Sequence, residues 1–116
     1  MIFDLKPVDY DKHGRCVADY EVSDFYEKIG EELMEAHTQA VFADWMLWMA
    51  KRHNVSEEPT QEQAAHEVIE LLDLMTATAT RIDALAKKHG FSDERLAEMQ
   101  GYVVNKNRDR GYFDET

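Results

Sequence analysis

The chain has few of the residues that define several large classes of protein. Its 116 residues include one cysteine, two prolines and five glycines. The single cysteine, Cys16, excludes an intrachain disulfide and a site built from several thiolates, so we expect a reducing compartment. No apolar stretch approaches the roughly 20 residues of a membrane span. The first residues, Met-Ile-Phe-Asp-Leu-Lys-Pro, are too quickly charged for a signal peptide. We therefore expect a cytoplasmic protein without a membrane partner.

Basic residues are scarce relative to acidic ones. The chain has 13 Lys and Arg residues against 24 Asp and Glu residues, which gives a formal net charge of −11. Nucleic-acid phosphates require basic surfaces, so this balance excludes a general nucleic-acid binder. A phosphate compound can still be a ligand if a divalent metal bridges it to the protein. The length and the apolar fraction of 44% fit one domain with one core.

Apolar residues recur at steps of three and four along most of the chain, which predicts an all-α fold. We predict an irregular N-terminal segment over residues 1–22 and a helical domain over residues 23–116. Within that domain, long helices are expected over residues 24–53 and from about residue 60 to residue 89. A shorter helix is expected over residues 93–108. The two long helices are joined by a short loop and should pack antiparallel.

Cap residues set the expected helix ends. Ser23 is the predicted N-cap of the first long helix, and Ser92 that of the short one. Thr60 and Gln63 match a capping box for the second long helix. Gly90 is expected just beyond its last turn, where a left-handed residue often ends a helix.

The first helix is too apolar for a chain of this size. At 1.5 Å per residue it is about 45 Å long, and residues 41–50 are apolar on nearly all sides. Such a helix is buried on more than one side, and a single chain of 116 residues does not have enough surface to cover it. We therefore expect a homo-oligomer, a dimer or a tetramer, in which four-helix-bundle units form across subunits.

Both long helices carry carboxylates three residues apart, a spacing that places them on one helical face. Glu32 and Glu35 form one pair, and Glu70 and Asp73 the other. The second pair lies in the most apolar run of the chain, residues 68–75, where isolated carboxylates are costly to desolvate and clustered ones raise each other's pKa. A shared cation removes both costs. Four carboxylates without thiolates suit Mg²⁺ or Mn²⁺ better than Zn²⁺.

The motif Glu31-Glu32-x-x-Glu35, followed by Glu70-x-x-Asp73 and a basic segment at 105–111, resembles the all-α nucleoside triphosphate pyrophosphohydrolases of the MazG type. The resemblance covers roughly residues 24–112. Small single-domain forms found in phages look most similar, including those directed at purine deoxynucleotides. The resemblance implies hydrolysis of a (d)NTP to a (d)NMP and pyrophosphate with Mg²⁺ or Mn²⁺ as cofactor.

The same resemblance implies roles for the acids. Glu32, Glu35, Glu70 and Asp73 would be the metal ligands, and Glu31 would hold a further metal or orient the attacking water. Catalysis would then depend on Glu31, Glu32 and Glu35. The chain departs from the family pattern in two places. The spacer 36–69 is longer than usual, and the N-terminal segment has no counterpart, so the pocket shape and substrate choice do not follow.

Several further side chains are candidates for binding the substrate. Lys106, Asn107 and Arg110 can hold a triphosphate, since cations must offset its charge in so acidic a protein. Their alternative role is that of solvated groups at a helix C-terminus. Lys28 lies one turn before Glu32 and can reach phosphate.

Gln39 and Phe42 continue the face of Glu35 and are candidates for contact with the base. Phe42 can equally be a core residue.

Two other functions remain open for the whole chain. A di-iron carboxylate protein of the ferritin type would need Glu-x-x-His motifs, which these acids lack. A non-catalytic acidic interaction module would need the acids on the outside of the helices.

Overall fold

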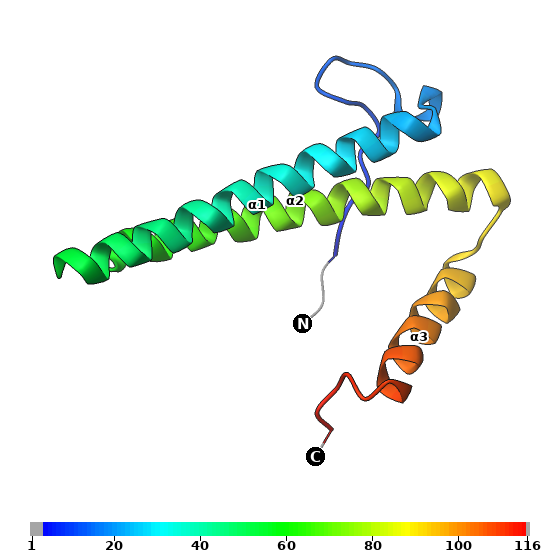
Figure 1. Ribbon diagram of the computed structural model, residues 1–116. Helices are drawn as coiled ribbons and strands as arrows, with labels where there is room; N and C mark the ends of the chain where they lie inside the picture. The colour runs from blue at the N-terminus through cyan, green and yellow to red at the C-terminus, as the bar shows by residue number, and fades with distance from the viewer. Residues whose placement is uncertain (1–3, 116) are drawn as a thin grey trace. The chain divides into compact units, whose positions relative to one another are not determined.

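The fold is all-α, as predicted (Figure 1). The computed structural model describes residues 4–115. The short 3-10 helix η1 (Val17–Asp19) is followed by α1 (Val22–His53), α2 (Glu58–His89) and α3 (Asp93–Asp109). No β-strand forms within the described range, and none of its helices has an apolar stretch long enough to cross a membrane.

The N-terminus of α1 differs from the prediction. The helix begins at Val22, and Glu21 is its N-cap residue, so Ser23 lies inside the first turn. The Asp24 carboxylate accepts the Glu21 N–H at 2.8 Å, which satisfies one of the unpaired donors at the helix start. Asp24 also accepts a bond from Arg15 at 2.8 Å. A contact from outside the helix thus holds the capping carboxylate in place, and the prediction for Ser23 was wrong.

The start of α2 also differs from the prediction. The helix begins at Glu58, whose N–H donates to the Ser56 hydroxyl at 3.2 Å. Thr60 and Gln63 therefore lie within the helix, and the predicted capping box was wrong. Pro59 fits the first turn because its missing N–H has no intrahelical partner to lose there.

The boundary between α2 and α3 agrees with the prediction. Gly90 has a φ of +69°, the left-handed conformation expected just after a helix. Ser92 is the N-cap of α3, and its side chain accepts the Arg95 N–H at 3.1 Å. Both residues act within their own turn of the chain, so their roles can be predicted from the residue type and its position in the sequence.

The chain divides into two compact units, Met1–Ile82 and Asp83–Thr116. The second unit holds the end of α2 and α3. In the first unit, α1 and α2 run antiparallel and side by side (Figure 1). The Gln63 side chain on α2 donates to the Gln39 side chain on α1 and to its carbonyl. The same register places Glu32 opposite Glu70 further along the pair.

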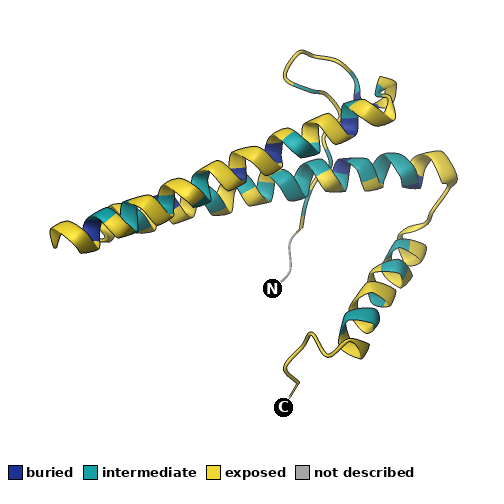
Figure 2. Cartoon of the chain, viewed as in Figure 1, coloured by how far each residue is buried: buried dark blue, intermediate teal, exposed yellow. Residues whose placement is uncertain are grey.

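The buried positions of α1 and of α2 in the first unit are distributed along both helices (Figure 2). They include Phe25, Ala36, Ala50, Gln63 and Thr80. Most are small or polar, and no large side chain is fully buried among the residues that the structure describes. Large apolar side chains, including Phe42, Trp45 and Trp48, are exposed instead.

Candidate metal centre

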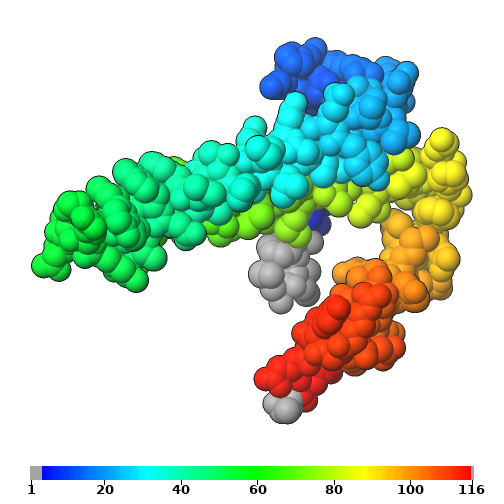
Figure 3. Space-filling view, in the orientation of Figure 1, coloured from blue at the N-terminus to red at the C-terminus, as the bar shows by residue number. Residues whose placement is uncertain are grey.

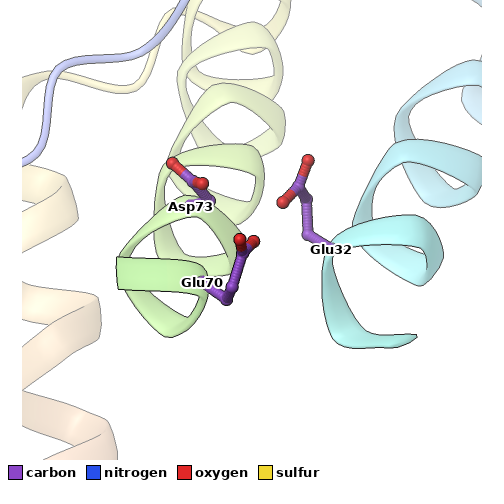
Figure 4. A group of neighbouring side chains, drawn as sticks. All are labelled: Glu32, Glu70 and Asp73. Carbon is purple, nitrogen blue, oxygen red and sulfur yellow. The ribbon is translucent and has the colours of Figure 1, made fainter. Parts of the chain in front are cut away.

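Three carboxylates meet between α1 and α2 (Figure 4). Glu32 comes from α1, and Glu70 and Asp73 come from adjacent turns of α2. One oxygen of each carboxylate lies within 4.8 Å of an oxygen of the other two. We call Glu32, Glu70 and Asp73 the acidic triad. The structure thus brings together three of the four predicted metal ligands.

Glu32 is the most buried member of the acidic triad, with 6% of its surface exposed. Its Oε1 lies 2.7 Å from the Lys28 ammonium. Its Oε2 is buried without a hydrogen-bond partner in the described structure, and the same holds for Oε2 of Glu70. A buried carboxylate oxygen without a partner costs free energy, because it has lost water and gained nothing. A cation between the two helices would satisfy both oxygens.

Glu35, the fourth predicted ligand, lies one turn beyond Glu32 on α1 and is exposed. It is not a member of the acidic triad. The negative charge of Glu32, some desolvation, and a hydrogen bond with Glu70 together raise the pKa of Glu35. Glu35 therefore interacts electrostatically with Glu32 and by a hydrogen bond with Glu70, both members of the acidic triad.

Lys28 and Glu31 lie at the edge of the same site. The Lys28 ammonium is 2.7 Å from Glu32 and 3.9 Å from Glu31. The hydrogen bond to Glu32 raises the pKa of Lys28, so the side chain stays charged and offsets part of the local negative charge. Glu31 is exposed and lines the cavity described next.

A cavity of about 480 Å³ opens beside the acidic triad. Its volume is within the range typical of small-molecule sites. Glu32 and Asp73 form part of its lining, and Thr76 and Thr80 extend the lining along α2. Another part of the lining comes from the N-terminal loop, residues 8–17. Analysis of the sequence missed this wall, because the turn residues of the loop give no indication of what it packs against.

Gln39 and Phe42, the predicted base contacts, do not line this cavity. Gln39 is bonded to Gln63 on α2. Phe42 stacks on Trp45 with ring centroids 5.8 Å apart. The two rings line a separate apolar groove together with His37, Thr38 and Val41. We therefore place Phe42 in an apolar surface and Gln39 in the contact between α1 and α2.

Lys106, Asn107 and Arg110 belong to the second unit, at the C-terminal end of α3. The Lys106 ammonium lies 5.7 Å from the centre of the Tyr102 ring. Arg110 is the C-cap residue, and its N–H donates to the Lys106 carbonyl at 3.2 Å. The predicted contact of these three side chains with phosphate stays a prediction.

The fold and the site define an all-α protein with a carboxylate cluster between two antiparallel helices, in which Glu32 is buried, Glu70 half-buried and Asp73 exposed. No family model, curated protein or solved structure matches the chain. The resemblance to MazG-type enzymes therefore rests on the acidic and basic residues quoted above.

Proposed function

We propose that the protein is a metal-dependent pyrophosphohydrolase that converts a (d)NTP and water to a (d)NMP and pyrophosphate. The acidic triad would bind Mg²⁺ or Mn²⁺. The observation that carries the proposal is the pair of buried, unpartnered oxygens, Oε2 of Glu32 and Oε2 of Glu70, beside Asp73. Ions of this kind, held by few carboxylates, complete their coordination with water and substrate phosphates. The cavity beside the triad provides room for such a ligand.

The residues around the acidic triad fit hydrolysis. A bound metal of this kind polarises a phosphoryl oxygen and promotes ionisation of water. Glu35 lies one turn from Glu32 on α1, so its carboxylate can accept a proton from the attacking water. Glu31, at the cavity edge, can orient that water. Lys28 forms an ion pair with Glu32 and so offsets part of the negative charge at the proposed metal site.

The geometry favours this function over the two alternatives. An acidic interaction module would present its carboxylates to a partner, whereas Glu32 is buried between the helices. A ferritin-type di-iron site would use histidine ligands, and the acidic triad contains none. Positions three residues after Glu35 and Glu70 hold Thr38 and Asp73.

The test is release of pyrophosphate from the common ribo- and deoxyribonucleoside triphosphates with Mg²⁺ or Mn²⁺. We expect hydrolysis of at least one of them. Glu35→Gln should lower the rate by about 100-fold or more, the range typical of losing a proton acceptor, and Asp73→Asn should lower it through loss of a metal ligand. Glu62→Gln is the matched control, because Glu62 is exposed on α2 outside the site. Absence of pyrophosphate from every nucleotide would refute the proposal.

We also propose that a second copy of the chain covers the apolar groove of α1. Trp45 and Trp48 are 53% and 54% exposed, and Phe42 and Val41 extend the same surface. Two α1–α2 pairs joined across this surface make a four-helix unit, most simply with two-fold symmetry. Such a dimer would bury the large side chains that the single chain leaves in contact with water.

Light scattering after size-exclusion chromatography tests the proposed dimer. We expect a mass of at least two chains for the wild type. Trp45→Glu should shift it to one chain, because the charge would be desolvated in the interface. Val55→Glu is the control, since Val55 is 60% exposed but lies outside the groove. A wild-type mass of one chain would refute the dimer and leave the proposed chemistry untouched.

A further inference from the structure

The N-terminal loop, residues 8–17, forms a wall of the cavity beside the acidic triad. In Figure 3 the loop lies against the first turns of α1. Val8 is anchored to α2, where its N–H donates to the Thr80 hydroxyl at 3.1 Å. This bond joins residues 72 positions apart. Since Thr80 and Asp73 both line the cavity, the loop is attached to the helix that carries two members of the triad.

The tip of the N-terminal loop is a tight turn organised by Asp11. One Asp11 oxygen accepts the N–H groups of His13 and Arg15 at 2.9 and 3.0 Å, and the other accepts the Tyr20 hydroxyl at 2.8 Å. Gly14 has a φ of +78°, a backbone conformation that would be strained for a residue with a side chain. The turn therefore holds its backbone in place without using the side chains of Lys12 and His13.

The loop carries three basic side chains, Lys12, His13 and Arg15, beside Asp9 and Asp11. Lys12, His13 and Arg15 all line the cavity. The guanidinium of Arg15 is already paired with Asp24 at 2.8 Å and stacked over Tyr20. Neither the Lys12 ammonium nor the His13 ring has an ion pair or a hydrogen bond to another side chain within residues 4–115. Both remain available for a ligand in the cavity.

We propose that the N-terminal loop is a phosphate-binding wall of this site, with Lys12 and His13 as the contacting side chains. The lining of the cavity combines carboxylates, among them Glu32 and Asp73, with basic side chains of the loop. The acidic triad would bind a divalent metal, and the loop would bind phosphate oxygens of the same ligand. A metal–polyphosphate has this distribution of charge. The inference rests on the proposed function for the identity of the ligand as a nucleoside triphosphate. It assigns the role of phosphate binding to the first unit, independently of Lys106 and Arg110.

The experiment uses inorganic triphosphate as the probe, because it contains the phosphate chain shared by all nucleoside triphosphates. Its binding to the full chain is measured by titration calorimetry in the presence of Mg²⁺. Loss of the Lys12 ammonium and of the His13 ring as hydrogen-bond donors in Lys12→Ala/His13→Ala should weaken binding by about tenfold or more. Lys6→Ala is the matched control, because Lys6 is exposed on the same segment but does not line the cavity. The melting shift caused by Mg²⁺ alone should be unchanged in the double variant, which shows that the fold and the acidic triad are intact.

The outcomes separate this inference from the proposed function. If the double variant binds triphosphate as tightly as the wild type, or if the wild type does not bind it, the inference is wrong. If the wild type binds triphosphate through the loop but hydrolyses no nucleotide, the inference stands and the proposed function fails. Where a nucleotide is hydrolysed, the double variant should raise KM by about tenfold with kcat nearly unchanged, since contacts made equally in the ground and transition states act on KM.

Discussion

Replacing Glu70 by glutamine tests whether the acidic triad is built for a cation. The substitution keeps the shape of the side chain and removes one negative charge. In the wild type, Oε2 of Glu70 is buried without a partner and lies beside Glu32 and Asp73. A glutamine amide can donate to one of those carboxylates, so the variant relieves an unsatisfied group that costs about 1–3 kcal/mol. We expect Glu70→Gln to be more stable than the wild type by about 1 kcal/mol in the presence of a chelator.

Addition of Mg²⁺ should reverse this order. A ligand that binds only the folded state at 100 times its Kd adds about 2.7 kcal/mol. An unfolding entropy of about 2.1 cal/mol/K per residue, applied to this chain length, makes 1 kcal/mol worth roughly 4 °C. The wild type should therefore gain about 11 °C on addition of saturating Mg²⁺. Glu70→Gln should start about 4 °C higher in the chelator and gain little from the metal.

The assay is thermal unfolding followed by circular dichroism, with a chelator and with Mg²⁺, for the wild type, Glu70→Gln and Glu62→Gln. Glu62→Gln removes the same charge from an exposed position of α2 and should keep the full response to the metal. A different result would refute the reasoning: Glu70→Gln melting below the wild type in chelator while still gaining about 11 °C from Mg²⁺. The triad would then be held together by contacts that need no ion.

Two further predictions follow from single groups. The pKa of Glu35 is raised in the metal-free folded state above its ordinary value of 4.5, so above that pH this carboxyl binds more protons in the folded protein than in the unfolded chain. Its contribution to stability should therefore be lost as the pH rises from 4.5 through the raised pKa, and urea unfolding of Glu35→Gln in chelator should lack this contribution. Ser92→Ala removes the cap of α3 and should cost about 1 kcal/mol, seen as faster amide exchange in the first turn of that helix. Ser23→Ala, which is not a cap, should change exchange in α1 very little.

The helices could be predicted from the sequence because their signals are local. Repetition of apolar residues at steps of three and four gave all three, and Ser92 and Gly90 act within their own turns. The start of α1 could not be predicted in the same way. Arg15, from the loop before the helix, fixes the carboxylate of Asp24 as the cap partner of Glu21. A tertiary contact decided between two chemically reasonable caps.

The acidic triad could also be predicted in part. Glu70 and Asp73 were candidates because they lie among apolar residues, and antiparallel packing of the long helices brings Glu32 opposite them. Gln39 satisfied the same helical spacing but is taken up by Gln63. Helical periodicity predicts the face on which a residue lies, but it does not predict which side chain of the neighbouring helix will bond to that residue.

The N-terminal wall of the cavity could not be predicted, because the anchor that defines it has no local signal. The bond from the Val8 N–H to Thr80 depends on how the first unit folds as a whole. Neither residue differs in type from many others along the chain. Aperiodic segments of this kind are read from the sequence as loops, and their packing partners are found only in three dimensions.

Different residues of the N-terminal loop maintain its structure and face the cavity, and this affects which substitutions the protein can tolerate. Asp11 and Gly14 maintain the turn, and Thr80 fastens it, whereas positions 12 and 13 project from it without supporting it. Mutations at those two positions can therefore accumulate without endangering folding. If the loop binds phosphate as proposed, substitutions at these two positions would change which anionic compound is bound, while the helices and their carboxylates stay the same.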